Sequence, residues 1–112
     1  MNDPIVQKWQ SQMYKGYLEL CVLLALRRHA MYGGQLRAML LEADLAVNEG
    51  TLYPLLNRME RNGWLCSTWQ MPEAGGHPRR LYRVRSAGLH HIDAMVCTNG
   101  RMQMVLHRLE KE

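Results

Sequence analysis

Residues 48–65 (N-E-G-T-L-Y-P-L-L-N-R-M-E-R-N-G-W-L) constrain the fold more than any other part of this sequence. Apolar side chains recur there at intervals of three and four residues, which predicts one buried stripe along a helix. They are Leu52, Leu55, Leu56 and Met59. Asn48 is a suitable N-cap and Asn62-Gly63 is a typical helix stop. We therefore expect a short helix whose apolar back packs against a core.

The opposite face of this predicted helix is cationic and able to form hydrogen bonds. Its residues are Thr51, Pro54, Asn57, Arg58 and Arg61. Such a face could lie in a groove of DNA or be an ordinary solvated surface, and the helix considered alone favours the solvated surface. Pro54 leaves two helix starts open. Either it lies within the helix and removes the donor for the carbonyl of Gly50, or the helix begins near Thr51 and Pro54 falls in its first turn.

The composition limits the class of protein. A chain of 112 residues forms one domain with a modest core. The net charge of +4 and the pI of about 9.2 suit a nucleic-acid partner but are too weak a bias to decide. The three cysteines have no C-x-x-C spacing, which is typical of a reduced, cytoplasmic protein. The longest apolar run, residues 18–26, is too short to span a membrane.

The chain before residue 48 predicts three further segments of helix. Residues 1–14 form a short amphipathic helix, Gly16 interrupts it, and residues 17–28 form a second, central helix that is apolar almost all round. Residues 30–34 form a turn, residues 34–41 a third helix and residues 42–47 a connector. Helices joined by short turns before an amphipathic, cationic helix are typical of a helix-turn-helix.

The period of the pattern changes after Gly63. Residues 64–71 and residues 79–85 are predicted strands, joined by a Gly-Pro loop over residues 72–78. The second strand carries four arginines, which could reach phosphates or a narrow minor groove, or could protect a solvated edge strand. Because this hairpin directly follows a helix-turn-helix pattern, we interpret it as the wing of a winged helix.

The last predicted helix covers about residues 87–110, with Ser86 as its cap. It carries a seam at successive spacings of three and four residues. The seam consists of Ile92, Met95, Asn99, Met102, Leu106 and Leu109. Such a narrow seam predicts pairing with another chain, and the competing interpretation is that it folds back onto its own domain. We expect a DNA-binding part over residues 1–86 and a dimerisation helix over residues 87–112.

Three motifs together resemble the PadR family of bacterial transcriptional regulators. They are Tyr32-Gly33 with Leu36, E-G-T-L-Y-P-L-L-N-R-M-E-R-N-G at residues 49–63, and G-G-H-P-R-R-L-Y-R-V at residues 75–84 followed by Gly88. The resemblance covers about residues 17–89. It implies a mainly helical protein with a small β-hairpin: a winged helix-turn-helix with an N-terminal helix and a long C-terminal dimerisation helix.

The resemblance also implies a function. Members generally repress transcription as homodimers on operator DNA, and a small molecule can release them. The single C-terminal helix is similar to the small subfamily, some members of which hold flat aromatic drugs between tryptophans of that helix. Residues 87–110 contain no Phe, Trp or Tyr, so that pocket is not expected in the same form. The substitutes that we consider for a ligand site are Trp9, Met13, Met95 and Asn99. Trp9 could instead pack on a neighbouring helix or contact the partner in a dimer.

We predict the following DNA contacts for a homodimer on a pseudo-palindromic operator. The groove contacts are Thr51, Tyr53, Asn57 and Arg58, because Asn can read adenine and Arg guanine. The phosphate contacts are Arg61 and the helix start near Asn48. Wing contacts are His77, Arg79 and Arg80, and Tyr32 and Gln35 clamp the adjacent phosphates. Tyr53 lies at the flank of the apolar stripe, so it could equally be a core residue.

Two other classes of function compete with this interpretation. An enzyme is not expected, because the sequence has no nucleophile–base motif and no Gly-rich phosphate loop. Cys66, His77 and Cys97 lack the spacing of metal ligands, so we expect no metal or other cofactor. A winged helix that serves only as a protein-interaction module is the alternative. The cationic helix face and the arginines of the wing favour DNA over that alternative.

Overall fold

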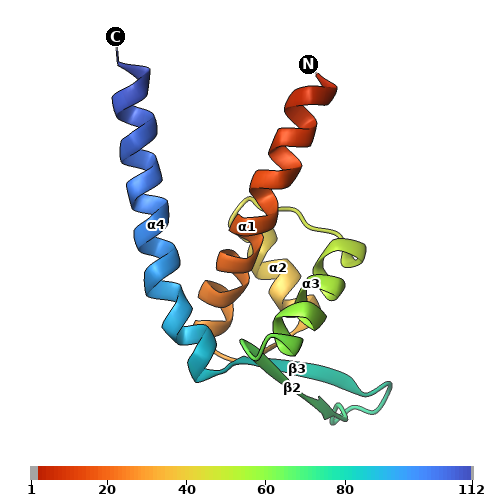
Figure 1. The fold of residues 1–112 in the computed structure, drawn as a ribbon. Helices are drawn as coiled ribbons and strands as arrows, with labels where there is room; N and C mark the ends of the chain where they lie inside the picture. The colour runs from red at the N-terminus through yellow and green to blue at the C-terminus, as the bar shows by residue number, and fades with distance from the viewer. Residues whose placement is uncertain (1–2, 112) are drawn as a thin grey trace.

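The computed structural model describes residues 3–111, which form four helices and three strands (Figure 1). In chain order they are α1 (Pro4–Arg28), β1 (Met31–Tyr32), α2 (Gly33–Glu42), α3 (Glu49–Arg61), β2 (Leu65–Gln70), β3 (Arg79–Val84) and α4 (Ser86–Glu110). Helices α1 and α4 lie close together above the sheet and diverge towards the two chain ends (Figure 1). We call residues 4–17 and 96–110 the arms, and residues 18–95 the body.

Helix α1 is one continuous helix, so the prediction of two helices separated at Gly16 is wrong. A glycine within a helix costs only about 1 kcal/mol relative to alanine, which the helical residues on both sides can offset. The side chain of Asp3 caps the helix by accepting a hydrogen bond from the Ile5 N–H at 2.9 Å. Gly16 is exposed, and no other atom lies within 4 Å of the position that its Cβ would take. Nothing in its surroundings therefore forces the helix to end there.

The core of the body lies where the second half of α1 meets α2, α3 and the sheet. Its most completely buried side chains include Leu23 of α1, Leu36 of α2 and Leu65 of β2. The predicted stripe of α3 is buried in full, which confirms the interpretation of residues 48–65: Leu52, Leu55, Leu56 and Met59. The same cluster includes Leu18, Val22, Leu23 and Leu26, which confirms the central position predicted for residues 17–28.

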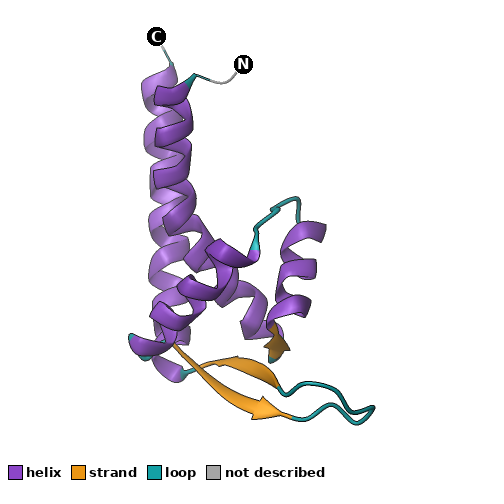
Figure 2. Ribbon diagram, turned by 90° about the vertical axis from the view of Figure 1, so that its right-hand side faces the viewer, coloured by secondary structure: helices purple, strands orange, loops and turns teal. Residues whose placement is uncertain are grey.

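The three strands form an antiparallel sheet in the order β1-β3-β2. The predicted hairpin is confirmed, with Leu65 opposite Val84 and Gln70 opposite Arg79. Residues 30–34 were predicted as a turn, but residues 31 and 32 pair with β3 as strand β1. A strand of two residues is too short to show an alternating pattern, so the sequence carries no signal for it. The hairpin projects beyond the helices (Figure 2).

Helix α3 begins at Glu49, so Pro54 lies inside it and not in its first turn. Asn48 is its N-cap and accepts a hydrogen bond from the Thr51 N–H at 2.8 Å. At the other end Gly63 has a φ of +81°, a left-handed conformation that favours glycine. The N–H of Trp64 donates to the carbonyl of Met59 at 3.0 Å, which closes the helix and directs the chain into β2.

Helix α4 joins the body only over its first turns. Arg85, and not Ser86, is its N-cap residue. A Cβ on Gly88 would lie 2.5 Å from the carbonyl oxygen of Trp64, so only glycine allows this close approach. Ile92 is 1% exposed and belongs to the core, whereas every residue from 101 to 110 is exposed. Among the helices of residues 3–111, none is long and apolar enough to cross a membrane.

Candidate nucleic-acid interface

The polar face of α3 is open to solvent along its whole length. All five residues assigned to it from the sequence are exposed: Thr51, Pro54, Asn57, Arg58 and Arg61. Arg58 lies at the flank towards α1, where its guanidinium is 3.7 Å from the carboxylate of Glu19. Asn57 lies at the other flank, towards the hairpin, where it accepts a hydrogen bond from Arg80 at 3.3 Å.

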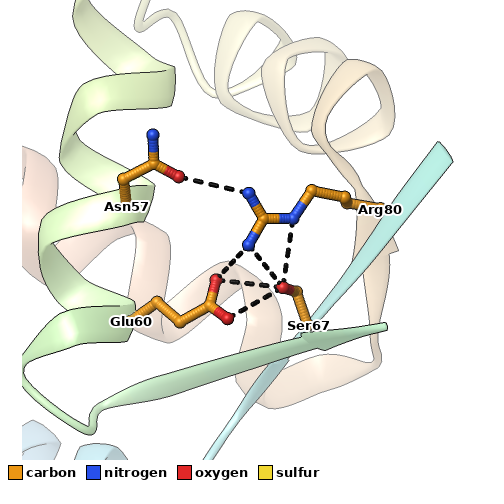
Figure 3. A network of polar contacts seen from close by, with 4 residues as sticks. All are labelled: Asn57, Glu60, Ser67 and Arg80. Carbon is orange, nitrogen blue, oxygen red and sulfur yellow. Dashed lines mark hydrogen bonds and ion pairs between the residues drawn. The ribbon is translucent and has the colours of Figure 1, made fainter. Parts of the chain in front are cut away.

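Arg80 joins the hairpin to α3 through a network of polar contacts (Figure 3). Its guanidinium donates to the carboxylate of Glu60 at 2.6 Å and to the hydroxyl of Ser67 at 2.7 Å. Ser67 in turn donates to Glu60 at 2.9 Å. The side chains of Arg80 and Glu60 are less than one third exposed. Charge-assisted hydrogen bonds of this kind are about twice as strong as neutral ones, so the network fixes the wing against α3.

Two aromatic rings flank the guanidinium of Arg80. The ring centroid of Tyr82 lies 5.3 Å from it and that of Trp69 lies 5.6 Å from it. Burial raises the pKa of the Tyr82 phenol, although the adjacent Arg80 charge acts in the opposite direction. Cation–π contacts within about 6 Å add to the hydrogen bonds in holding an arginine in place. Trp69 itself is 68% exposed near the outer end of the hairpin.

A second cluster surrounds Tyr32 at the start of α2. Its hydroxyl donates to the side chain of Gln70 at 2.8 Å, and the guanidinium of Arg79 lies 4.2 Å from its ring centroid. The side chain of Gln35 accepts a hydrogen bond from the Tyr32 N–H at 2.9 Å. The structure therefore brings the three predicted residues Tyr32, Gln35 and Arg79 together. It leaves Arg79 exposed, whereas Arg80 is only partly exposed.

Tyr53 lies between the core and this surface. It is half-buried and packs against the core cluster, while part of its ring lines the groove between α2 and the wing. A Cβ on Gly33 would lie 2.6 Å from the Tyr53 ring, so a larger residue at the start of α2 would displace this ring. The packing supports the core alternative for Tyr53. A DNA contact by this residue stays a prediction.

The remaining site residues lie on separate parts of the surface. His77 is exposed in the loop between β2 and β3, and Asn48 is exposed at the start of α3. Sequence reasoning missed the partners that hold the site together, which are Glu60, Ser67, Gln70 and Trp69. Only Glu60 had a signal in the sequence, because its carboxylate lies one turn after Asn57 and between Arg58 and Arg61.

Comparisons with known proteins agree with this geometry. The model of the transcriptional regulator PadR-like family matches residues 22–94. The chain belongs to this family. It is therefore a DNA-binding transcriptional regulator with a winged helix-turn-helix fold, in a family that is generally non-enzymatic.

Solved PadR-like structures resemble the chain over nearly its whole length. A PadR-like transcription factor from Bacteroides fragilis is 31% identical, with a TM-score of 0.79 and coverage of 91% of this chain and 98% of that one. A PadR family regulator from Eggerthella lenta is 30% identical, with a TM-score of 0.80 and coverage of 98% and 96%. A PadR-like regulator from Bacillus cereus is 27% identical, with a TM-score of 0.76 and coverage of 90% and 98%. No curated protein sequence matches the chain.

The residues predicted for dimer and ligand contacts lie in the arms and in the adjoining part of α4, which includes Ile92 and Met95. Met13, Met95 and Asn99 line one shallow groove between α1 and α4. The hydroxyl of Tyr17 donates to the amide oxygen of Asn99 at 2.5 Å, which ties α1 to α4 within the chain. Trp9 is 59% exposed and does not line this groove.

The predicted seam of α4 divides into two parts. Ile92 is buried in the core of its own chain and Met95 packs against that core, so the folding-back interpretation holds for this half. Farther along, the apolar side chains are exposed: Met102, Leu106 and Leu109. Ile92 therefore offers no surface to a partner chain, contrary to its place in the predicted seam.

In the described part of the chain, titratable side chains do not gather into a metal centre. Within residues 3–111, no group of three or more His, Cys, Asp and Glu side chains could hold a metal ion. Cys21 lies partly buried against the core, and this burial raises the pKa of its thiol. The raised pKa disfavours the reactive thiolate at neutral pH, in agreement with a packing role for this residue.

Proposed function

We propose that this PadR-like regulator represses transcription by binding a pseudo-palindromic operator as a homodimer. One α3 helix from each chain enters the major groove, and the two half-sites lie about 34–36 Å apart, one turn of DNA. The observation that carries the proposal is the exposed polar face of α3, held beside an arginine-bearing wing by the contact between Asn57 and Arg80.

The residues have separate roles in this proposal. Thr51, Asn57 and Arg58 contact base edges, because their exposed side chains lie on the outer face of α3. Arg61 and the N-terminal turn near Asn48 contact phosphates. Arg79 and His77 hold the DNA backbone from the wing, with Tyr32 and Gln35 supporting Arg79. We assign no phosphate to Arg80, because most of its donors are already used within the protein.

The arms support the homodimer. Their apolar side chains include Trp9 of α1 and Leu106 and Leu109 of α4, all of them more than half exposed. Exposed apolar surface of this kind marks an interaction site. A second copy of the chain presents the same two stripes, so a twofold arrangement covers both at once. Asn99 lies at the boundary of this surface, where its oxygen is already bound by Tyr17.

Release by a small molecule is the last part of the proposal. The groove lined by Met13, Met95 and Asn99 lies between the two helices that diverge towards the chain ends (Figure 1). A ligand that binds better to one separation of these helices than to another would change the spacing of the two α3 helices. The apolar lining fits an apolar effector.

A fluorescence-polarisation titration tests the DNA-binding part. The protein is titrated against the DNA upstream of its own gene and against a scrambled duplex, each at two salt concentrations. We expect tight, sequence-dependent binding that weakens as salt rises, because phosphate contacts release counterions. Absence of binding even at low salt would refute the proposal and leave the protein-interaction module as the alternative.

A further inference from the structure

The contact between Arg80 and Asn57 fixes which way the Asn57 amide faces. A guanidinium carries only donors, whereas an amide has an accepting oxygen and a donating nitrogen. Arg80 can therefore bind only the oxygen of Asn57, and the distance between these groups is 3.3 Å. Figure 3 shows the amide nitrogen of Asn57 turned away from Arg80. Arg80 cannot easily swing aside, because Glu60 and Ser67 hold the same guanidinium at 2.6 and 2.7 Å.

This orientation determines what Asn57 can recognise. An asparagine that reads adenine uses both amide atoms: the nitrogen donates to N7, and the oxygen accepts from the N6 amino group. With its oxygen bound to Arg80, Asn57 presents mainly its NH2 group. Guanine offers two acceptors in the major groove and thymine offers O4. Adenine offers the single acceptor N7 beside a donor, and cytosine offers only a donor.

We propose that Arg80 is a positioning residue that makes Asn57 act mainly as a donor. Asn57 then favours guanine or thymine at one operator position over cytosine, and over adenine, whose N6 amino group loses its accepting partner. This inference rests on the proposed function, because it requires α3 to lie in the major groove. It replaces the sequence-based expectation that Asn57 reads adenine. It also assigns the two neighbouring arginines different tasks, with Arg79 for the DNA backbone and Arg80 for base selectivity.

Selection from a randomised duplex library tests this assignment. The wild-type protein first gives the preferred base at each operator position, and the variant Asn57→Ala identifies the position at which the preference disappears. We expect guanine or thymine at that position in the wild type. In Arg80→Ala the freed oxygen should shift the preference towards adenine by at least about fivefold, since one base contact discriminates by about 1–3 kcal/mol.

A second variant and two controls keep the outcome clear. Arg80→Lys keeps a positive charge beside Glu60 but has one nitrogen in place of three, so it should show the same shift in a folded protein. Arg79→Ala should weaken binding to all sequences and keep the wild-type preference. In the Asn57→Ala background, Arg80→Ala should change no base preference, because it acts only through Asn57.

Several results would overturn the inference. One is an adenine preference in the wild type, and another is an unchanged preference in every Arg80 variant that binds. A third is loss of binding by both Arg80 variants at wild-type melting temperature, which would make Arg80 a direct DNA contact. Failure of the proposed function itself looks different, because the wild-type protein would then select no sequence at all.

Discussion

The two halves of α1 belong to regions that are stabilised in different ways. In the body, Leu18, Val22 and Leu26 face a core that α2, α3, the sheet and the start of α4 close from all sides. In the arm, Ile5 and Trp9 of the same helix are mostly exposed. The hydrophobic effect therefore stabilises the body within one chain, whereas several large apolar side chains of the arms stay exposed.

This difference teaches how function is divided along the chain. The body fixes the polar face of α3 and the wing, and the network around Arg80 joins the two without help from the arms (Figure 3). In the proposed homodimer the arms would set the distance between two copies of the body. Substitutions in the body should therefore change folding stability or DNA contacts, and substitutions in the arms should change assembly.

The largest effect is expected from a cavity in the body. Leu56→Ala removes a side chain that is fully buried, which should lower the free energy of unfolding by about 2–5 kcal/mol. Leu106→Ala is the matched variant in the arm, where the same truncation at an exposed position should cost less than about 0.5 kcal/mol at monomeric dilution. Urea denaturation measures both, and equal losses would break the distinction between body and arms.

Two glycines of α4 compare the regions within one helix. Gly88→Ala places a Cβ 2.5 Å from the Trp64 carbonyl oxygen and should cost about 1–3 kcal/mol through overpacking. Gly100→Ala meets no atom within 4 Å and should instead stabilise the helix by up to about 1 kcal/mol. The melting temperature should thus fall in Gly88→Ala and rise in Gly100→Ala. A change in the same direction in both variants would contradict the account of how α4 joins the body.

The DNA-binding role of the wing predicts a moderate effect. Arg79→Ala should weaken binding to every duplex. In the proposed dimer it should reduce the slope of log affinity against log salt by about 1.8, or about 0.9 for each of the two lost phosphate contacts. Adding Arg80→Ala should weaken binding further by loosening the wing. Arg108→Ala, at the end of the α4 arm, is the control that should keep the wild-type slope. Polarisation titrations at several salt concentrations measure these slopes, and a wild-type slope in Arg79→Ala would refute the wing assignment.

The smallest effect is expected at the end of α2. Asp44 has a φ of 70°, and its N–H donates to the Leu41 carbonyl at 2.9 Å in a helix-ending turn that favours glycine. Asp44→Gly relieves this left-handed conformation but makes the unfolded chain more flexible, so the net gain should be below about 1 kcal/mol. Thermal unfolding should show a small rise in melting temperature. A fall would show that the Asp44 side chain stabilises the fold by more than its left-handed backbone conformation destabilises it.

The sequence predicts the periodic parts of this molecule and misses the contacts between them. The stripe of α3, the hairpin and the long α4 each repeat a pattern over many residues, so their prediction succeeds. Strand β1 has two residues and shows no pattern. Gly16 is tolerated inside a helix of 25 residues, so a glycine alone does not predict a helix end.

The candidate site could be predicted only in part, for a similar reason. The exposed face of α3 follows from helical spacing alone. The network of Glu60, Ser67 and Arg80 joins three elements through the pairing register of β2 and β3, which no spacing along the chain reveals. Only the structure therefore shows that Arg80 forms its hydrogen bonds within its own chain, and that one of them orients Asn57.

The central claim is that the arms bring two bodies onto one operator. Sedimentation velocity of the protein mixed with a fluorescent duplex carrying both half-sites tests it most directly, because it gives the mass of the complex. We predict two chains on each duplex for the wild type, and a monomer that binds the duplex weakly for Leu106→Glu, which places a charge in the exposed apolar stripe. A wild-type complex with one chain on each duplex, or an unchanged dimer in Leu106→Glu, would contradict the account.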